Sequence, residues 1–197
     1  MSVPGVILAG GLSRRMGGGD KTLLALDGRP ILDHVIDRLR PQTTALAINA
    51  NGDPARFARF DLPILPDTVD GHPGPLAGVL AAMRFAAKKG GDAVLTAPAD
   101  TPFLPRDLAR RLGEARPADG IAMASGAGRT HPVCALWPVS LADTLERTLR
   151  DEDERRIIRF AERHGLAIVP FDDDDDPFFN VNTPDDLATA QARFDHV

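Results

Sequence analysis

The sequence has 197 residues, of which 43% are apolar, so it is long enough to bury a sizeable core in one globular domain. Its formal net charge is −5, and five acidic residues form one run, Asp172 to Asp176, so the remaining chain is formally neutral. A neutral body with 5% aromatic residues and no tyrosine argues against nucleic-acid binding. The single cysteine, Cys134, excludes an internal disulfide framework and a cysteine-based zinc site.

Membrane association is also not expected. The chain contains no apolar run of about 18 residues, the length that a membrane-spanning helix needs. The first five residues place no basic region ahead of an apolar segment, so no secretory signal is visible. We therefore expect a cytoplasmic protein with no membrane or nucleic-acid partner. No shift in composition divides the chain, and we expect one domain over residues 1–197.

The first half of the chain alternates predicted strands with predicted helices. Short apolar runs that end at turn residues predict buried strands over 6–8, 45–48, 62–65 and 93–96. Helical spacing of apolar residues, with proline at the first helical position, predicts helices opened by Pro30 and by Pro75. Asp27-Gly28 predicts a small hairpin before the first helix. This alternation predicts a parallel sheet with helices on both faces.

The second half predicts further elements of both kinds. Strands are expected over 121–124, 133–137 and 167–171, and helices over 104–112, 141–149, 157–164 and 185–194. Thr183 is the expected N-cap of the last helix, with Pro184 after it and Asp186 three positions on. Ligands of parallel sheets bind beyond the carboxyl ends of the strands. The polar segments after the first four strands are therefore the expected place for a site.

The loop after the first strand combines glycines with positive charge. Residues 8–21 contain two glycine clusters together with Arg14, Arg15 and Lys21. Exposed backbone N–H groups in such a loop can form an anion-binding concavity, and fixed cations strengthen it, so the loop suits a polyphosphate. The spacing fits neither a P-loop nor a dinucleotide-binding glycine motif. A solvated loop with ordinary surface charges is the alternative interpretation.

The exact amino-acid sequence of this loop is more informative than its composition. Residues 8–21 read Leu-Ala-Gly-Gly-x-Ser-x-Arg-Met-Gly-x-x-Asp-Lys, which resembles the signature loop of the molybdenum cofactor guanylyltransferases. Other segments are similar to later motifs of that family, and these are 49–51, Asp67, 74–78, 98–105, 129–133 and 180–184. The resemblance covers residues 6–190. It implies a Rossmann-like three-layer α/β sandwich with a mostly parallel sheet, of the nucleotide-diphospho-sugar transferase type.

The resemblance implies transfer of GMP from GTP to the terminal phosphate of molybdopterin or Mo-molybdopterin, with release of pyrophosphate. The Leu-Ala-Gly-Gly and Asn-Val-Asn-Thr-Pro spellings favour the guanylyl branch over cytidylyl relatives. Alternatives are molybdopterin cytidylyl transfer, another phosphate-acceptor nucleotidyltransferase, and a nucleotide-binding regulatory protein without turnover. Contacts with other molybdenum cofactor proteins are also implied. One departure is Gly52, where the family often has arginine.

The site residues follow from the same resemblance. The catalytic residues that it implies are Arg15, Lys21 and Asp100, with Mg²⁺ bound at Asp100. The GTP-binding residues that it implies are Leu8, Ala9, Gly10, Lys21, Asn49, Asp67 and Asp100. Asn180 and Asn182 are the expected acceptor-binding residues, since strand alternation would place both amides on one face. The alternatives are a helix-capping role for Asp100 and turn chemistry for the asparagines.

Several further residues are interpreted as structural. His131 precedes a proline and a strand, and it is expected to be a structural or surface histidine. Cys134 lies in an apolar run and is expected in the core, and the pair at 178–179 is expected to pack. The acidic run from Asp172 to Asp176 lacks calcium-binding spacing and is interpreted as a solvated loop.

Overall fold

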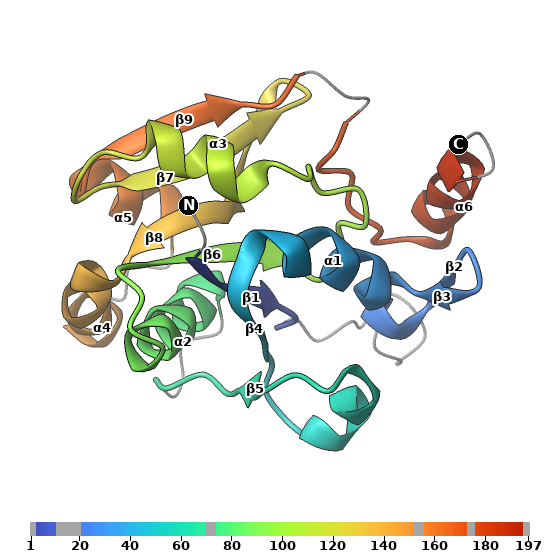
Figure 1. Ribbon diagram of the computed structural model, residues 1–197, viewed down its shortest axis with the longest axis horizontal. Helices are drawn as coiled ribbons and strands as arrows, with labels where there is room; N and C mark the ends of the chain where they lie inside the picture. Colours follow the sequence, from blue (N-terminus) through green and yellow to red (C-terminus); the bar gives the residue numbers. More distant parts are fainter. Residues whose placement is uncertain (1–2, 11–20, 70–73, 152–155, 173–175, 195–197) are drawn as a thin grey trace.

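A mostly parallel sheet forms the centre of the fold (Figure 1). The computed structural model describes residues 3–10, 21–69, 74–151, 156–172 and 176–194. Within that part the sheet has seven strands in the order β5-β4-β1-β6-β8-β7-β9. Strand β8 runs antiparallel to both neighbours, and the other pairings are parallel. The strands are β1 (Val3–Leu8), β4 (Thr43–Asn49), β5 (Ile64–Leu65), β6 (Ala93–Pro98), β7 (Ile121–Gly126), β8 (Arg129–Pro138) and β9 (Leu166–Pro170).

Helices cover both faces of this sheet, which confirms the three-layer α/β prediction (Figure 1). Helices α1 and α3 pack on one face, and α2, α4 and α5 pack on the other. Helix α6 lies beside the hairpin of β2 (Ala25–Leu26) and β3 (Arg29–Pro30). The helices are α1 (Ile31–Leu39), α2 (Pro75–Lys88), α3 (Leu108–Ala115), α4 (Ala142–Asp151), α5 (Ile157–Arg163) and α6 (Pro184–Phe194). Short 3₁₀ helices are η1 (Lys21–Leu23), η2 (Arg40–Gln42), η3 (Pro54–Phe60) and η4 (Val139–Leu141).

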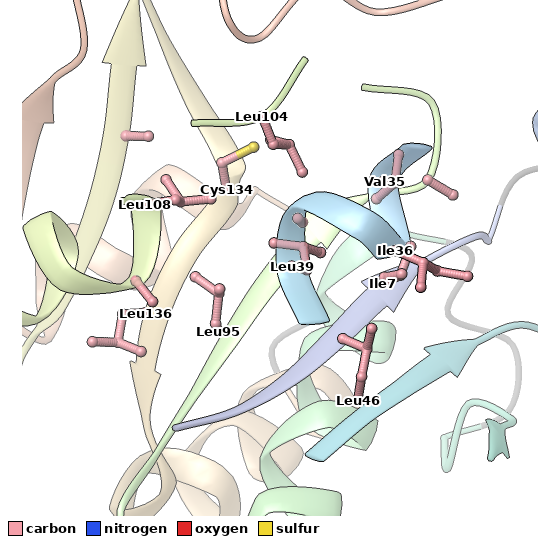
Figure 2. Close-up of a cluster of buried hydrophobic side chains, with 14 of the residues drawn as sticks. Ile7, Val35, Ile36, Leu39, Leu46, Leu95, Leu104, Leu108, Cys134 and Leu136 are labelled. Carbon is pink, nitrogen blue, oxygen red and sulfur yellow. The ribbon is translucent and has the colours of Figure 1, made fainter. Parts of the chain in front are cut away.

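The two faces of the sheet build two separate cores, because successive side chains of a strand point in opposite directions. In β1, Ile7 joins the core under α1 and α3, whereas Val6 joins the core under α2. Figure 2 shows the first of these cores, with Leu39 of α1 and Leu108 of α3 packed over the sheet. Cys134 is buried in this core, as predicted, and burial raises the pKa of its thiol far above the ordinary value.

Several predicted boundaries differ from the structure, among them the starts of α3 and α1. Helix α3 begins at Leu108 instead of residue 104, because a residue that precedes proline is disfavoured in a helix and Leu104 precedes Pro105. The Leu104 side chain is still fully buried. Pro30 is the N-cap of α1 with an extended ψ of 142°, so the helix begins one residue later than expected. No described helix is long and apolar enough to cross a membrane.

The strand register brings four chain segments to one edge of the sheet. Leu8, the last residue of β1, pairs with Asn49 at the end of β4 and with Pro98 at the end of β6. Asn49 also pairs with Leu65 at the end of β5. We call the residues that directly follow these four strands the carboxyl edge. The edge therefore collects residues 9–10, 50–51, 66–67 and 99–101.

Candidate functional site

Two asparagines hold a carboxylate at the carboxyl edge. Asn49 Nδ2 donates to Asp67 Oδ1 at 2.9 Å, and Asn51 Nδ2 donates to Asp67 Oδ2 at 2.7 Å. The backbone N–H of Asp67 returns a hydrogen bond to Asn51 Oδ1 at 2.9 Å. Each carboxylate oxygen thus accepts one amide N–H and keeps lone pairs for other donors. We call Asn49, Asn51 and Asp67 the amide–carboxylate cluster.

Asn49 is the buried anchor of this cluster, with an exposed fraction of 3%. Its Nδ2 also donates to the Leu65 carbonyl at 3.0 Å, so both of its amide hydrogens are used within the protein. A Cβ at Gly78 of α2 would collide with Asn49 Oδ1, which explains why glycine suits that helical position. These contacts show Asn49 holding Asp67 in place.

The start of the first loop lies between two strand ends. The Ala9 N–H donates to the Asn49 carbonyl at 2.9 Å, and the Ala99 N–H donates to the Leu8 carbonyl at 3.2 Å. Gly10 is exposed beside the Asn49 side chain. Leu8, Ala9 and Gly10, which are predicted to bind GTP, therefore lie between the amide–carboxylate cluster and the chain around Asp100.

A second cluster forms at the end of β6. The Thr101 hydroxyl donates to Asn180 Oδ1 at 2.7 Å and lies 3.5 Å from Asp100 Oδ1. The Val181 N–H donates to the Asp100 carbonyl at 2.9 Å. We call Asp100, Thr101 and Asn180 the Asp100 cluster. Sequence analysis missed Thr101, although it lies inside the motif at 98–105, because only the fold brings Asn180 to it.

The surroundings of Asp100 do not match its alternative role as a helix cap. The N-cap of α3 is Asp107, seven positions further along the chain. Asp100 instead is the second residue after β6 and is half-buried. The helix-capping interpretation of Asp100 is therefore wrong.

Asn180 and Asn182 do not lie in a strand. The prediction that strand alternation places both amides on one face is therefore wrong. Asn180 is half-buried and Asn182 is exposed. The backbone N–H groups of Asn182 and Thr183 both donate to Asp186 Oδ2, at 2.9 and 2.8 Å. Asp186 N–H donates back to Thr183 Oγ1 at 3.1 Å, which completes a reciprocal cap of α6. The predicted cap at Thr183 is confirmed.

Among the three cations of the first loop, Lys21 is the first residue of η1, whereas Arg14 and Arg15 lie outside the described residues. Their predicted roles stay predictions. Gly52, the departure from the family pattern, has a φ of +85°, which an arginine would adopt only with strain. The local backbone therefore explains the glycine.

His131 supports the chain that leads to Asn180. Its ring stacks on Phe178 with centroids 4.4 Å apart, and its Nε2 lies 3.3 Å from the Gly126 carbonyl. Burial lowers the pKa of His131, and the nearby charge of Arg129 lowers it further, while the Gly126 carbonyl and Asp176 act in the opposite direction. Phe178 is fully buried, as the packing interpretation predicted. Asp176 is half-buried and lies 3.7 Å from Arg129, so this end of the acidic run is not fully solvated.

The carboxyl edge fits a cation that takes few ligands from protein. The described residues contain no group of three or more His, Cys, Asp or Glu side chains that could hold a metal. Asp100 supplies one half-buried carboxylate. A hard divalent cation can bind through one or two carboxylates together with substrate phosphates, and Asp100 could supply such a carboxylate.

A hollow of about 320 Å³ lies away from this site, at the amino end of β6. Its lining includes Asp92, Arg116 and Ser140. Arg116 is largely buried there, donates to the Ala118 carbonyl at 3.1 Å and lies 3.7 Å from Asp92. None of the predicted site residues lines this hollow, so we place the candidate site at the carboxyl edge.

The fold and the edge define a class of protein, namely α/β proteins that bind a nucleotide at the carboxyl ends of parallel strands. Residues 5–167 match the family described as MobA-like NTP transferase domain, and the chain belongs to that family.

Relatives and a solved structure agree with this assignment. The chain is 56% identical to a molybdenum cofactor guanylyltransferase of Rhodopseudomonas palustris (strain BisB5), with 96% of this chain and 93% of the relative covered. It is 54% identical to a molybdenum cofactor guanylyltransferase of Mesorhizobium japonicum, covering 95% and 94%. The crystal structure of molybdopterin-guanine dinucleotide biosynthesis protein A from Archaeoglobus fulgidus is similar with a TM-score of 0.78 and 25% identity, covering 99% and 100%. These similarities confirm the resemblance described above.

Proposed function

We propose that this chain transfers GMP from GTP to the terminal phosphate of molybdopterin, or of its molybdenum-loaded form, and releases pyrophosphate. The observation that carries the proposal is the carboxyl edge, where the first loop starts between the carboxylates of Asp67 and Asp100. The names of the relatives at 54% and 56% identity support guanylyl transfer in particular. We also propose that the enzyme is one domain over residues 1–197, acts in the cytoplasm and contacts other molybdenum cofactor proteins.

In this reaction the protein must align the acceptor phosphate with the α-phosphate of GTP and stabilise the negative charge of the phosphates. A phosphate oxygen of the acceptor attacks the α-phosphorus of GTP, a P–O bond forms, and the bond to the β-phosphate oxygen breaks. Because the attacking group is already an anion, no side chain has to remove a proton from it. In-line positioning and stabilisation of negative charge carry the catalysis. We assign the charge stabilisation to Arg15 and Lys21, and contact with GTP to Leu8, Ala9 and Gly10 at the start of the first loop.

We assign recognition of the base to Asp67. Guanine presents two adjacent donors, N1–H and the 2-amino group, and a carboxylate can accept both. Adenine and cytosine place a ring-nitrogen acceptor where guanine has N1–H, so the carboxylate would repel them. Asn49 and Asn51 serve this role by holding both oxygens of Asp67.

We assign the metal and the acceptor to the Asp100 cluster. Asp100 would hold Mg²⁺, which when bound supplies positive charge to the phosphates of GTP. Asn180 accepts from Thr101 through its Oδ1, so its Nδ2 remains the end that can donate to an acceptor phosphate. Asn182 is exposed near the start of α6 and would contact the acceptor further out.

The decisive experiment offers the purified protein molybdopterin, Mg²⁺ and each of the four nucleoside triphosphates in turn. We expect product and pyrophosphate with GTP at rates well above those with CTP or ATP. Equal or faster transfer with CTP would replace this proposal with cytidylyl transfer. Nucleotide binding without turnover by any triphosphate would indicate a regulatory protein.

A further inference from the structure

The chain reverses direction after Asn51, so that Arg56 contacts the amide–carboxylate cluster. Gly52 has a φ of +85°, and the Asp53 carboxylate then accepts the Ala55 N–H at 2.9 Å, which caps η3. In η3, Arg56 Nη2 donates to the Asn51 carbonyl at 2.9 Å. The left-handed turn at Gly52 and the cap at Asp53 thus bring the Arg56 side chain to Asn51, the residue that hydrogen-bonds Asp67.

The hydrogen bond from Arg56 holds the backbone of Asn51, whereas Asp67 holds its side chain. The side chain of Asn51 makes two hydrogen bonds with Asp67, and its backbone carbonyl accepts from Arg56. The two anchors of Asp67 therefore differ. Asn49 is buried in β4 and needs no further support, whereas Asn51 is exposed and lies in the turn that Arg56 closes.

We propose that Arg56 is a positioning residue that sets base selectivity at Asp67 by holding Asn51. This inference rests on the proposed function, in which Asp67 binds the guanine edge. With one amide anchor, the Asp67 carboxylate can rotate about its Cβ–Cγ bond, and with two anchors its plane is fixed. A fixed plane matters most for a base with two adjacent donors, since both oxygens must meet their hydrogens together. Arg56 itself does not touch the substrate.

The chain offers a matched control in Arg59. It lies one turn further along η3, is also exposed, and its guanidinium lies 5.4 Å from the Phe60 ring centroid. Arg56 similarly lies 4.6 Å from the Phe57 ring centroid. Arg59 Nη2, however, lies 3.4 Å from Asp33 of α1. Replacing Arg59 removes an equal charge and a similar ring contact while the Arg56–Asn51 hydrogen bond stays.

The test measures equilibrium affinity of the full chain for GTP and for ITP, whose base lacks the 2-amino group. Loss of one supporting hydrogen bond predicts that Arg56→Ala weakens GTP binding about 3- to 10-fold. ITP binding should weaken less, so the GTP-to-ITP affinity ratio falls, and Arg59→Ala should keep the wild-type ratio. Arg56→Met, which keeps the aliphatic stem over Phe57, should lower the ratio as Arg56→Ala does. This second variant covers the case in which the alanine protein does not fold.

Three outcomes would overturn the inference: equal weakening of GTP and ITP by Arg56→Ala, an unchanged ratio in Arg56→Met, or the same loss of ratio in Arg59→Ala. The last would indicate a general effect of positive charge. Failure of the proposed function would look different, because the wild-type protein would then prefer CTP over GTP or show no preference. A wild type that prefers GTP, combined with an unchanged ratio in both Arg56 variants, rejects the role of Arg56 alone.

Discussion

The two clusters at the carboxyl edge are assembled over very different distances along the chain. In the amide–carboxylate cluster, Asn51 and Asp67 are 16 positions apart, and they follow the neighbouring strands β4 and β5. In the Asp100 cluster, Thr101 and Asn180 are 79 positions apart. The first cluster needs a single parallel strand pair, whereas the second needs the chain after β9 to return to the end of β6. One half of the site is therefore nearly local, and the other depends on the complete fold.

This difference separates the expected consequences of substitution. Changes in the amide–carboxylate cluster should alter the choice of nucleotide, since its bonds converge on Asp67. Changes in the Asp100 cluster should alter turnover or acceptor binding. The predictions below test whether the two clusters act separately, and they run from the largest expected effect to the smallest.

The largest effect is expected from Asp100→Asn, which keeps the shape and removes the charge that would hold the metal. Metal stabilisation of a transferring phosphate is worth several kcal/mol, so turnover should fall by about 100-fold or more. The measurement is turnover at saturating GTP and Mg²⁺. Asp107→Asn, at the start of α3, is the matched control and should retain activity. Near-normal turnover in Asp100→Asn would remove Asp100 from the proposed catalytic residues.

Asp67→Asn should act on nucleotide choice. Hydrogen bonds to a charged group are worth more than neutral ones, so we expect GTP affinity to fall about 10- to 100-fold. The preference for GTP over ITP should fall with it, as measured by titration with each nucleotide. Asp61→Asn is the control, because Asp61 is exposed at a left-handed φ of 50°, which asparagine tolerates. Unchanged discrimination in Asp67→Asn would show that Asp67 does not bind the base.

Asn182→Asp tests whether the acceptor has its own site. The new carboxylate would lie beside an anionic acceptor, and like charges near the surface should weaken acceptor binding roughly fivefold or more. GTP affinity should change little, and the two affinities are measured in separate titrations. Thermal unfolding serves as the control, since Asp186 already accepts the Asn182 N–H. An equal loss of GTP affinity would mean that Asn182 belongs to the nucleotide pocket or to the fold.

The smallest effect is expected at His131, and it depends on pH. Burial lowers the folded-state pKa of His131, so the unfolded chain takes up the proton first as the pH falls. Stability should therefore decrease on acidification through the ordinary titration range of histidine, near 6.5, and down to the lower folded pKa. Arg129 and Asp176 are the charged groups that act on the ring.

His131→Phe, which keeps a ring against Phe178, should make thermal unfolding less dependent on pH between about 7.5 and 5. At pH 8 the two proteins should differ little in pH sensitivity. An identical pH dependence in both proteins would contradict the assignment of this effect to His131.

Much of the fold could be predicted because its signals act over short distances. The apolar runs located the strands, and Asp27-Gly28 correctly indicated the hairpin, where both residues have positive φ. The prediction failed where a local preference was misjudged, as at the start of α3, or where a tertiary contact decided the structure. The segment at 180–182 is irregular because its hydrogen bonds go to Asp100, Thr101 and Asp186 instead of to a strand.

The sequence motifs shared with the family named most residues of the candidate site, but they could not show which of these residues contact one another. Asn49 and Asp67 could be named from the sequence. The burial of Asn49, and its close approach to Gly78 where a side chain would clash with it, could not. Arg56 carried no signal in the sequence, because its contact with Asn51 depends on the turn at Gly52.

The sequence by itself determined the order of strands and helices, the parallel first half of the sheet and the polar character of its carboxyl edge. These features follow from side-chain periodicity and backbone sterics, which operate within a few residues. Only the tertiary structure decided that Asn180 meets Thr101 and that Asp67 is held from two sides. Hydrogen bonds between distant residues form only when the whole sheet has set the register of its strands, and no local pattern records that geometry.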